Sequence, residues 1–260
     1  MPLSTVQHNC MLSSLLPDLD LSESLANLSI TGLSLDSRLV KPGHLFFAVP
    51  GFLQDGRDYI HSSLQSGAEI VLYQPDKKLL PDNERIVPIA NLNQKISEIS
   101  GRFYSHPSKK IALTGITGTN GKTTCTQLLA HLLSFVNGPV GVIGTLGYGS
   151  IMAKKTDLKT KGMTTPNPID IQSILADFVA SDINQAVMEV SSHGISQFRI
   201  NSLLFETAVF TNLSHDHLDY HGNLENYSKI KKELFSMPGL KNAVINIDDT
   251  VGSKIAEELS

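Results

Sequence analysis

One short stretch of the sequence, TNLSHDHLDYHG at residues 211–222, gathers side chains that can bind a metal ion or a phosphate group. It holds three histidines and two aspartates: His215, Asp216, His217, Asp219 and His221. The spacings HDH and LDYH do not match the usual zinc patterns, and no cysteine is nearby. An apolar run at residues 207–210 comes just before, which predicts that the stretch lies beyond the end of a strand. These observations leave a magnesium site, a phosphate site or an ordinary loop.

A glycine-rich stretch, GITGTNGKTT at residues 115–124, has the chemistry of a phosphate-binding loop. It follows the predicted strand KIALT and opens a predicted helix, whose N-terminus carries partial positive charge. Lys122 can reach the β- and γ-phosphates of a nucleotide, and the Thr123 hydroxyl can bind Mg²⁺. The strict pattern G-x-x-x-x-G-K-[ST] fails at one position, because its first glycine falls on Ile116. The alternative is a glycine-rich turn that binds nothing.

Glu189 and His217 each stand near the end of a predicted strand. Glu189 interrupts the apolar run AVMEV, and a buried carboxylate needs a cation, a hydrogen-bond donor or water. If both strands belong to the sheet that carries the glycine-rich loop, the two side chains converge with that loop on one edge. Such a group could hold Mg²⁺, although oxygen ligands are more usual than imidazole. The alternative for His217 is a hydrogen-bonded loop residue, and we keep that interpretation for His215 and His221.

A lysine occupies an apolar position in a helix predicted at residues 223–236. The helical stripe at i, i+3, i+4, i+7 and i+8 comprises Tyr227, Ile230, Lys231, Leu234 and Phe235. Lys231 is therefore predicted to face inward. In one interpretation its stem is buried while its amine reaches water. In the other, the amine points to the edge that binds phosphate.

Strands and helices alternate in two successive patterns along the chain. Strands are predicted at residues 44–49, 68–73, 85–90, 110–117, 139–145, 185–190, 206–211 and 242–247. Helices are predicted at residues 58–67, 91–104, 123–136, 168–181 and 223–236, and residues 251–259 are amphipathic. The alternation predicts an α/β fold with right-handed crossovers and mostly parallel sheets. Residues 106–108 resemble a linker, so we expect one domain at residues 1–108 and a second at 109–260.

Composition limits the class of protein. The 260 residues are 41% hydrophobic and 18% charged, as in an ordinary globular chain. A net charge of −4 gives no general reason to bind nucleic acid. The chain has two distant cysteines, no lysine or arginine before Arg38, and no apolar run near the roughly 20 residues that span a bilayer. We expect a cytoplasmic monomer without a membrane span. Nothing marks Ser260 as a natural terminus, so we also expect a piece of a longer protein.

Several of these stretches together resemble the Mur ligase family of ATP-dependent enzymes that form amide bonds. The resemblance rests on TGTNGKTT, MEVSSHG, FTNLSHDHLDYHG and YSKIKKELF. The further stretches LDSR, GHLFFAVPG, DGRDYI and GRFYSHPS narrow it to members that add the third residue of the peptidoglycan stem peptide. It covers residues 35–249. It implies a small N-terminal α/β domain that binds a UDP-sugar, followed by an ATP-binding domain with a mostly parallel sheet of the P-loop type.

The resemblance also implies a role for individual residues. The nucleotide would bind at Gly118, Thr119, Asn120, Gly121, Lys122, Thr123 and Thr124, with Asn246 and Asp248 close to it. Magnesium would be held by Thr123, Glu189, His217 and Lys231, the last as a carbamate formed with CO₂. Uridine would meet Leu35 and Ser37, and the diphosphate would meet Phe52, Leu53 and Gln54. The muramoyl peptide would bind at Thr164, Thr165, Ser191, Gln197 and Arg199. The residues expected to serve catalysis are Lys122, Glu189, His217 and Lys231.

The implied substrates are ATP, UDP-N-acetylmuramoyl-L-Ala-D-Glu and a diamino acid, either diaminopimelate or lysine. The family has a third, C-terminal domain that binds the amino acid, so we expect this chain to bind the first two substrates and to have little activity alone. One rival is another ligase of the superfamily, such as a folylpolyglutamate synthase. LDSR, GHLFFAV and DGRDYI argue against it. A second rival is a P-loop module that binds or hydrolyses a nucleotide without a UDP-sugar site.

Overall fold

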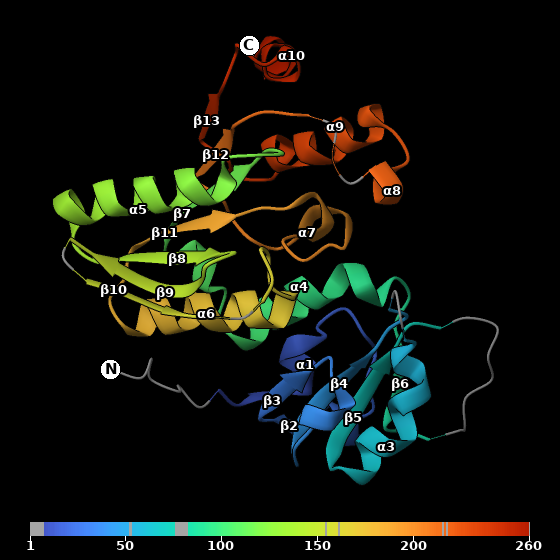
Figure 1. The fold of residues 1–260 in the computed structure, drawn as a ribbon. Coiled ribbons are helices and arrows are strands. Elements are labelled where there is room, and N and C mark those ends of the chain that lie inside the picture. The colour runs from blue at the N-terminus through green and yellow to red at the C-terminus, as the bar shows by residue number, and fades with distance from the viewer. Residues whose placement is uncertain are drawn as a thin grey trace. The chain divides into compact units, whose positions relative to one another are not determined.

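The computed structural model describes residues 8–51, 54–75, 83–153, 155–160, 162–214, 216 and 218–259. These residues form two compact units, one ending at Ser105 and one beginning at His106 (Figure 1). Ser105 and His106, on either side of this boundary, both have positive φ angles, of 60° and 49°, which residues other than glycine rarely adopt.

The first unit is built on a four-stranded parallel sheet in the order β3-β4-β5-β6. Its strands are β3 Gly32–Ser34, β4 His44–Ala48, β5 Ala68–Tyr73 and β6 Ile86–Pro88. A small antiparallel pair, β1 Cys10–Met11 and β2 Ser29–Ile30, forms a separate sheet. The helices are α1 Leu12–Leu15, α2 Glu23–Ala26, α3 Ile60–Gln65 and α4 Leu92–Phe103, with 3-10 helices η1 Ser37–Leu39 and η2 Gly56–Tyr59. The strands and helices predicted between residues 44 and 104 are confirmed.

The second unit contains a seven-stranded sheet in the order β10-β9-β8-β11-β7-β12-β13. Its strands are β7 Ala112–Thr117, β8 Val140–Gly144, β9 Gly147–Met152, β10 Lys155–Lys159, β11 Gln185–Glu189, β12 Thr207–Phe210 and β13 Asn242–Ile245. The five strands from β8 to β13 in this order run parallel, and β9 and β10 add an antiparallel hairpin at one side. The predicted fold class, α/β with mostly parallel sheets, is confirmed.

Helices cover both faces of the seven-stranded sheet (Figure 1). They are α5 Lys122–Asn137, α6 Pro168–Ala180, α7 Ser192–Ser196, α8 Leu218–His221, α9 Leu224–Lys232 and α10 Thr250–Leu259, with 3-10 helices η3 Pro107–Lys109 and η4 Glu233–Ser236. Side chains alternate along each strand. In β11, Val187 faces the core beneath α5, whereas Met188 joins a larger core with residues of α6, α7 and η4.

The strand register positions the candidate site. β7 lies between β11 and β12, with Ile116 opposite both Glu189 and Val209. Because the three strands are parallel, their carboxyl ends meet at one edge of the sheet. The strands that end at Glu189 and before His217 therefore belong to the sheet that carries the glycine-rich loop, as the predicted convergence requires. Within the described ranges, no helix is long and apolar enough to cross a membrane.

Candidate functional site

The glycine-rich loop connects β7 to α5 and has a backbone that requires glycine. Gly118 and Gly121 have φ angles of 146° and 83°, values that side chains rarely allow. A Cβ on Gly118 would collide with the hydroxyl of Thr211. The loop then enters the 16-residue helix α5 directly, so free backbone N–H groups lie at its N-terminus.

Residues 211–214, which have the sequence TNLS, brace this loop through hydrogen bonds. The Thr119 N–H donates to the Asn212 carbonyl at 2.8 Å, and the Asn120 N–H donates to Asn212 Oδ1 at 3.0 Å. The Thr211 hydroxyl donates to the Asn120 carbonyl at 2.7 Å. The stretch after β12 therefore holds the shape of the loop after β7.

Lys122 folds back onto its own loop. Its Nζ donates to the carbonyl oxygens of Gly118 and Thr119, at 2.9 and 2.8 Å. Burial lowers the pKa of Lys122, and the charges of Glu189 and Asp216 partly oppose this. The amine is thus held at the loop by neutral carbonyls, which an anionic ligand could replace.

Glu189, at the end of β11, is only 1% exposed and is surrounded by hydrogen-bond donors. Its carboxylate accepts bonds from the Thr123 hydroxyl at 2.9 Å, the Thr145 N–H at 2.8 Å and the Thr145 hydroxyl at 3.1 Å. A carboxylate and a hydroxyl next to a phosphate-type loop are the oxygen donors that Mg²⁺ prefers. The chemistry of Thr123 and Glu189 therefore fits a magnesium ion.

Lys231 reaches the loop from α9. It is 1% exposed, and its Nζ donates to the Gly118 carbonyl at 2.7 Å. Burial, the largest cause, and the positive charge of Lys122 together lower the pKa of Lys231 to about 7, while the negative charge of Asp216 acts in the opposite direction. The prediction that Lys231 faces inward is confirmed, and its amine does not reach water.

The remaining predicted metal ligand, His217, lies outside the described residues, as do His215, Phe52 and Leu53. In the described part of the chain, no three His, Cys, Asp or Glu side chains are grouped as a metal site. His221, which we expected to be an ordinary hydrogen-bonded residue, is buried, and its Nε2 lies 2.9 Å from the Ser192 hydroxyl.

The side chains predicted to bind the muramoyl peptide lie together at the ends of β8 and β11. The Thr165 hydroxyl donates to the Glu189 carbonyl at 3.0 Å and accepts the Ser191 N–H at 3.0 Å. The Arg199 guanidinium donates to the Thr165 carbonyl and to Gln197 Oε1. Burial lowers the pKa of Arg199. These bonds fix the guanidinium close to the Glu189 edge.

Four further predicted residues border the same edge. Thr164 lies next to Glu189's partner Thr145, with 3.0 Å between the two hydroxyl oxygens. Asn246 follows β13, and its side chain donates to the Thr211 carbonyl at 2.8 Å. Asp248 is exposed and donates its N–H to Asn246 Oδ1 at 3.1 Å. Thr124 lies exposed in the first turn of α5.

In the first unit, Leu35, Ser37 and Gln54 line one pocket of about 400 Å³. Two similar turns flank it, in LDSR and DGRD. Asp36 accepts the backbone N–H of Arg38 at 3.0 Å, and Asp55 accepts that of Arg57 at 3.0 Å. In each turn the same aspartate also pairs with the arginine side chain. The pocket therefore has fixed polar walls.

Sequence reasoning missed several residues of the site. Thr145 and Asn212 were not predicted, because threonine and asparagine in a loop carry no distinctive spacing. Tyr227 was assigned only to an apolar stripe, yet its hydroxyl accepts a hydrogen bond from Thr119 Oγ1 at 3.3 Å. Tyr220 lies near Ser196 and Gln197, with oxygen–oxygen and nitrogen–oxygen distances of 3.2 and 3.4 Å.

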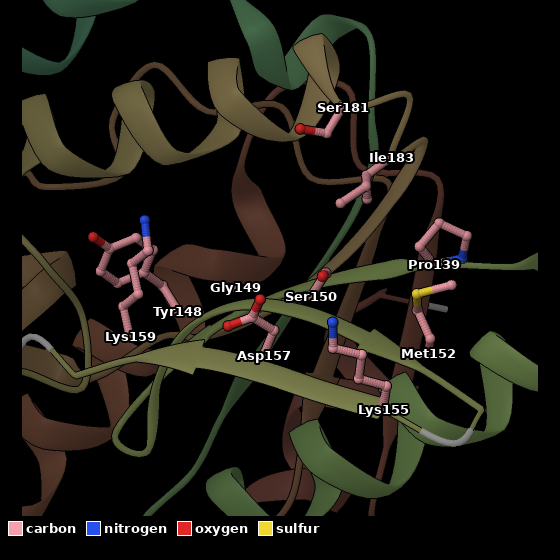
Figure 2. Close-up of a pocket in the computed structure, with 10 residues that line it drawn as sticks. All are labelled: Pro139, Tyr148, Gly149, Ser150, Met152, Lys155, Asp157, Lys159, Ser181 and Ile183. Carbon is pink, nitrogen blue, oxygen red and sulfur yellow. The ribbon is translucent and has the colours of Figure 1, made fainter. Parts of the chain in front are cut away.

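A pocket in the second unit, of about 310 Å³, lies along the β9–β10 hairpin and contains none of the predicted residues (Figure 2). Lys155, Asp157 and Lys159 of β10 line it beside Tyr148 and Ser150 of β9. Its charges alternate in sign, so it does not present a uniform field to an ion. We assign it no role.

Together these features describe an α/β protein with a phosphate-type loop, a buried carboxylate and a buried lysine at one edge of its sheet. Residues 116–260 match the model of the Mur ligase middle domain, and residues 29–104 match that of the Mur ligase family catalytic domain. The chain belongs to the Mur ligase family.

Similar proteins include two curated ligases and one solved structure. The UDP-N-acetylmuramoyl-L-alanyl-D-glutamate–2,6-diaminopimelate ligase of Pseudomonas aeruginosa is 45% identical over 89% of this chain and 47% of its own length. The ligase of the same name from Coxiella burnetii is 44% identical over 88% of this chain and 47% of its own. A solved structure of a ligase with this name matches with a TM-score of 0.83 and 28% identity, over 96% of this chain and 50% of that one. The chain thus spans about half the length of these relatives.

Proposed function

We propose that the chain provides the UDP-sugar-peptide and ATP sites of an ATP-dependent ligase that adds diaminopimelate to UDP-N-acetylmuramoyl-L-Ala-D-Glu in peptidoglycan synthesis. The observation that carries the proposal is the group at one sheet edge, where Thr123 meets Glu189 and Lys231 meets Gly118. The 44–45% identity to ligases of that name supports the choice of diaminopimelate over lysine.

In this proposal the nucleotide phosphates lie over the loop from Gly118 to Thr124, and Lys122 exchanges its loop carbonyls for phosphate oxygens. Asn246 and Asp248 lie close to the nucleotide. Mg²⁺, when bound through Thr123, Glu189 and His217, neutralises charge on the transferring phosphoryl group. The buried lysine amine adds CO₂: its lone pair bonds to the carbon, one C=O electron pair moves to oxygen, and one N–H proton leaves. Lys231 would then carry a carbamate, whose oxygen atoms could help to hold Mg²⁺.

In the first unit, the proposed contacts are with the uridine diphosphate end of the UDP-sugar peptide. Leu35, Ser37 and Gln54 contact its uridine diphosphate end, together with Phe52 and Leu53. Thr164, Thr165, Ser191, Gln197 and Arg199 contact the muramoyl peptide. Arg199 suits the carboxylates of D-Glu, because a guanidinium binds a carboxylate through two parallel hydrogen bonds.

The reaction has two steps. A carboxylate oxygen of the peptide attacks the γ-phosphorus of ATP, ADP leaves, and an acyl phosphate forms. The neutral amine of the diamino acid then attacks the acyl carbon, phosphate leaves with the electrons of the broken C–O bond, and the nitrogen loses a proton. The chain's share is to hold the acceptor and to offset negative charge through Lys122 and the N-terminus of α5. We propose that this chain binds both substrates but turns over little by itself.

The test is calorimetric titration with UDP-N-acetylmuramoyl-L-Ala-D-Glu in the presence of Mg²⁺ and bicarbonate. We expect saturable binding that Arg199→Ala abolishes, while the control Arg85→Ala leaves it unchanged. A parallel titration with ATP and Mg²⁺ is expected to lose its signal in Lys122→Ala. A folded sample that binds folate and no muramoyl peptide would favour the folylpolyglutamate synthase class. Binding of ATP alone would favour a nucleotide-binding module without a UDP-sugar site.

A further inference from the structure

A cluster of buried polar side chains packs against the glycine-rich loop. Its members are Thr119, Ser192, His221, Tyr227 and Lys231, which are 7%, 2%, 6%, 1% and 1% exposed. They come from the loop and from helices α7, α8 and α9. Buried polar groups are costly unless they are paired, so such a cluster fixes one arrangement of the elements that carry it. The functional site described above assigns no role to Tyr227, His221 or Ser192.

Tyr227 lies at the centre of this cluster and contacts both the loop and Lys231. Its hydroxyl accepts a hydrogen bond from Thr119 Oγ1 at 3.3 Å. The Nζ of Lys231 lies 4.5 Å from the centre of its ring, within the distance at which a cation is attracted to an aromatic ring. One side chain thus contacts both the loop and the lysine amine, which also donates directly to the Gly118 carbonyl of the loop at 2.7 Å.

The ring of Tyr227 is itself supported. It stacks on the His221 ring, with 5.0 Å between the centres and 26° between the planes. His221 Nε2 lies 2.9 Å from the Ser192 hydroxyl at the start of α7. The stretches EVSSHG and DYHG, which stood apart in the sequence, are joined here by one contact.

We propose that Tyr227 is a positioning residue, whose ring holds the Lys231 amine and whose hydroxyl holds Thr119, so that the lysine and the loop keep a fixed relation. The proposal rests on the proposed function, in which the loop binds ATP and Lys231 is the reactive amine. His221 and Ser192 fix the plane of the ring.

Two substitutions separate the two contacts. Tyr227→Phe removes the hydroxyl, with its bonds to Thr119 and Ser192, and keeps the ring beside Lys231. Tyr227→Leu removes the hydroxyl and the ring together. If the leucine variant does not fold, Tyr227→Met is used in its place, because methionine fills more of the space without a ring. Tyr148→Phe is the matched control, since Tyr148 lies on the β9–β10 hairpin.

The first measurement needs no ligand. The whole chain is labelled briefly with acetic anhydride, and the modification of each lysine is read by mass spectrometry, with the exposed Lys229 as the internal standard. We expect Lys231 to react at the wild-type rate in Tyr227→Phe and about two- to thirtyfold faster in the variants without a ring, the factor that corresponds to a lost cation–π contact. An unchanged rate in those variants overturns the role of the ring.

The second measurement is titration with ATP and Mg²⁺. We expect Tyr227→Phe to bind about two- to tenfold more weakly than the wild type, as the loss of one hydrogen bond predicts, and Tyr148→Phe to bind equally well. Equal binding by Tyr227→Phe overturns the role of the hydroxyl. If the wild-type chain binds no ATP, the proposed nucleotide site fails. The labelling result then decides by itself whether Tyr227 positions Lys231.

Discussion

At the scale of single residues, Lys231 combines deep burial with an ionisable amine. Its pKa is about 7 in the folded chain, against 10.5 for an unperturbed lysine. Its neighbours are the positive Lys122, the negative Asp216 and the Tyr227 ring. A larger fraction of the amine is therefore neutral near pH 7 than in an exposed lysine, and the neutral amine is the form that adds CO₂.

This burial predicts a pH-dependent stability. Between pH 7 and 10.5 the unfolded chain binds one more proton at Lys231 than the folded chain, so the free energy of unfolding rises with pH in this window. The slope due to Lys231 is at most about 1.4 kcal/mol per pH unit. Below pH 7 the full cost of burying the charge is present and adds no slope. We expect Lys231→Met to reduce the slope by up to about 1.4 kcal/mol per pH unit. A smaller slope remains from other groups such as Lys122, whose pKa burial also lowers. Urea denaturation in CO₂-free buffer without metal measures the difference.

The exposed Lys229→Met is the control for this experiment, because it lies on the same helix in water. It should retain the wild-type slope. If Lys231→Met and Lys229→Met show the same pH dependence, then the amine of Lys231 is not held in a buried position in solution.

The sequence predicted those site residues whose type is unusual for their position. Lysine in an apolar helical stripe and glutamate in an apolar strand are both costly to bury, and both proved to be buried and bonded. Tyr227 could not be predicted in the same way. Tyrosine is common in apolar stripes, and its second role depends on a contact with Thr119, 108 residues away.

At the scale of structural elements, the glycine-rich loop depends on the close approach of two segments. Gly118→Ala forces a side chain into a left-handed conformation and against Thr211. We expect a loss of about 1–3 kcal/mol in unfolding free energy and weaker binding of ATP with Mg²⁺, because the TNLS brace must move. Thermal unfolding and calorimetry measure the two effects.

Gly149→Ala separates strain from function. Gly149 has a φ of 155°, and a Cβ there would collide with the Asp157 carbonyl in the β9–β10 hairpin. We expect a comparable loss of stability and unchanged ATP binding. If both variants lose ATP binding equally, general destabilisation explains the effect of Gly118→Ala.

Helix α5 offers a test on two adjacent residues. Leu132 is 65% exposed, whereas Leu133 packs on the core beneath the helix. We expect Leu133→Ala to cost about 2 kcal/mol and Leu132→Ala to stay within about 0.5 kcal/mol of the wild type. Urea denaturation of the two variants gives the comparison. A similar cost for both would mean that the outer face of α5 is covered in solution.

Among the elements, those with a strong apolar pattern were predictable and the β9–β10 hairpin was not. β8 and β11 are short apolar runs next to predicted helices, which is typical of central parallel strands. β10 has the sequence KTDLK and is almost wholly exposed. Its sequence therefore shows no alternation of apolar and polar residues that would predict a strand. Its pairing with β9 depends on Gly147 and Gly149, whose positive φ angles a sequence pattern does not reveal. The short strands and helices of residues 8–34 were missed for a different reason: each spans too few residues to show a periodic pattern.

At the scale of the whole molecule, each unit has its own sheet and its own hydrophobic core. We therefore expect residues 1–105, expressed alone, to unfold cooperatively and to retain any affinity of the chain for UDP. Circular dichroism during heating and titration with UDP provide the measurements. Residues 106–260 serve as the comparison and should bind no UDP. A non-cooperative transition for residues 1–105 would show that this unit needs the second one to fold.

In the proposed function, the carbonyl oxygen of Gly118 affects the rate at which a nucleotide binds. It accepts hydrogen bonds from Lys122 and from Lys231 at the same time. When a phosphate group draws Lys122 away, this oxygen keeps one donor, and only the Thr119 carbonyl loses its bond to a lysine. We therefore expect Lys231 to lower the barrier to the exchange, so that its removal slows the association of ATP more than it changes the affinity at equilibrium.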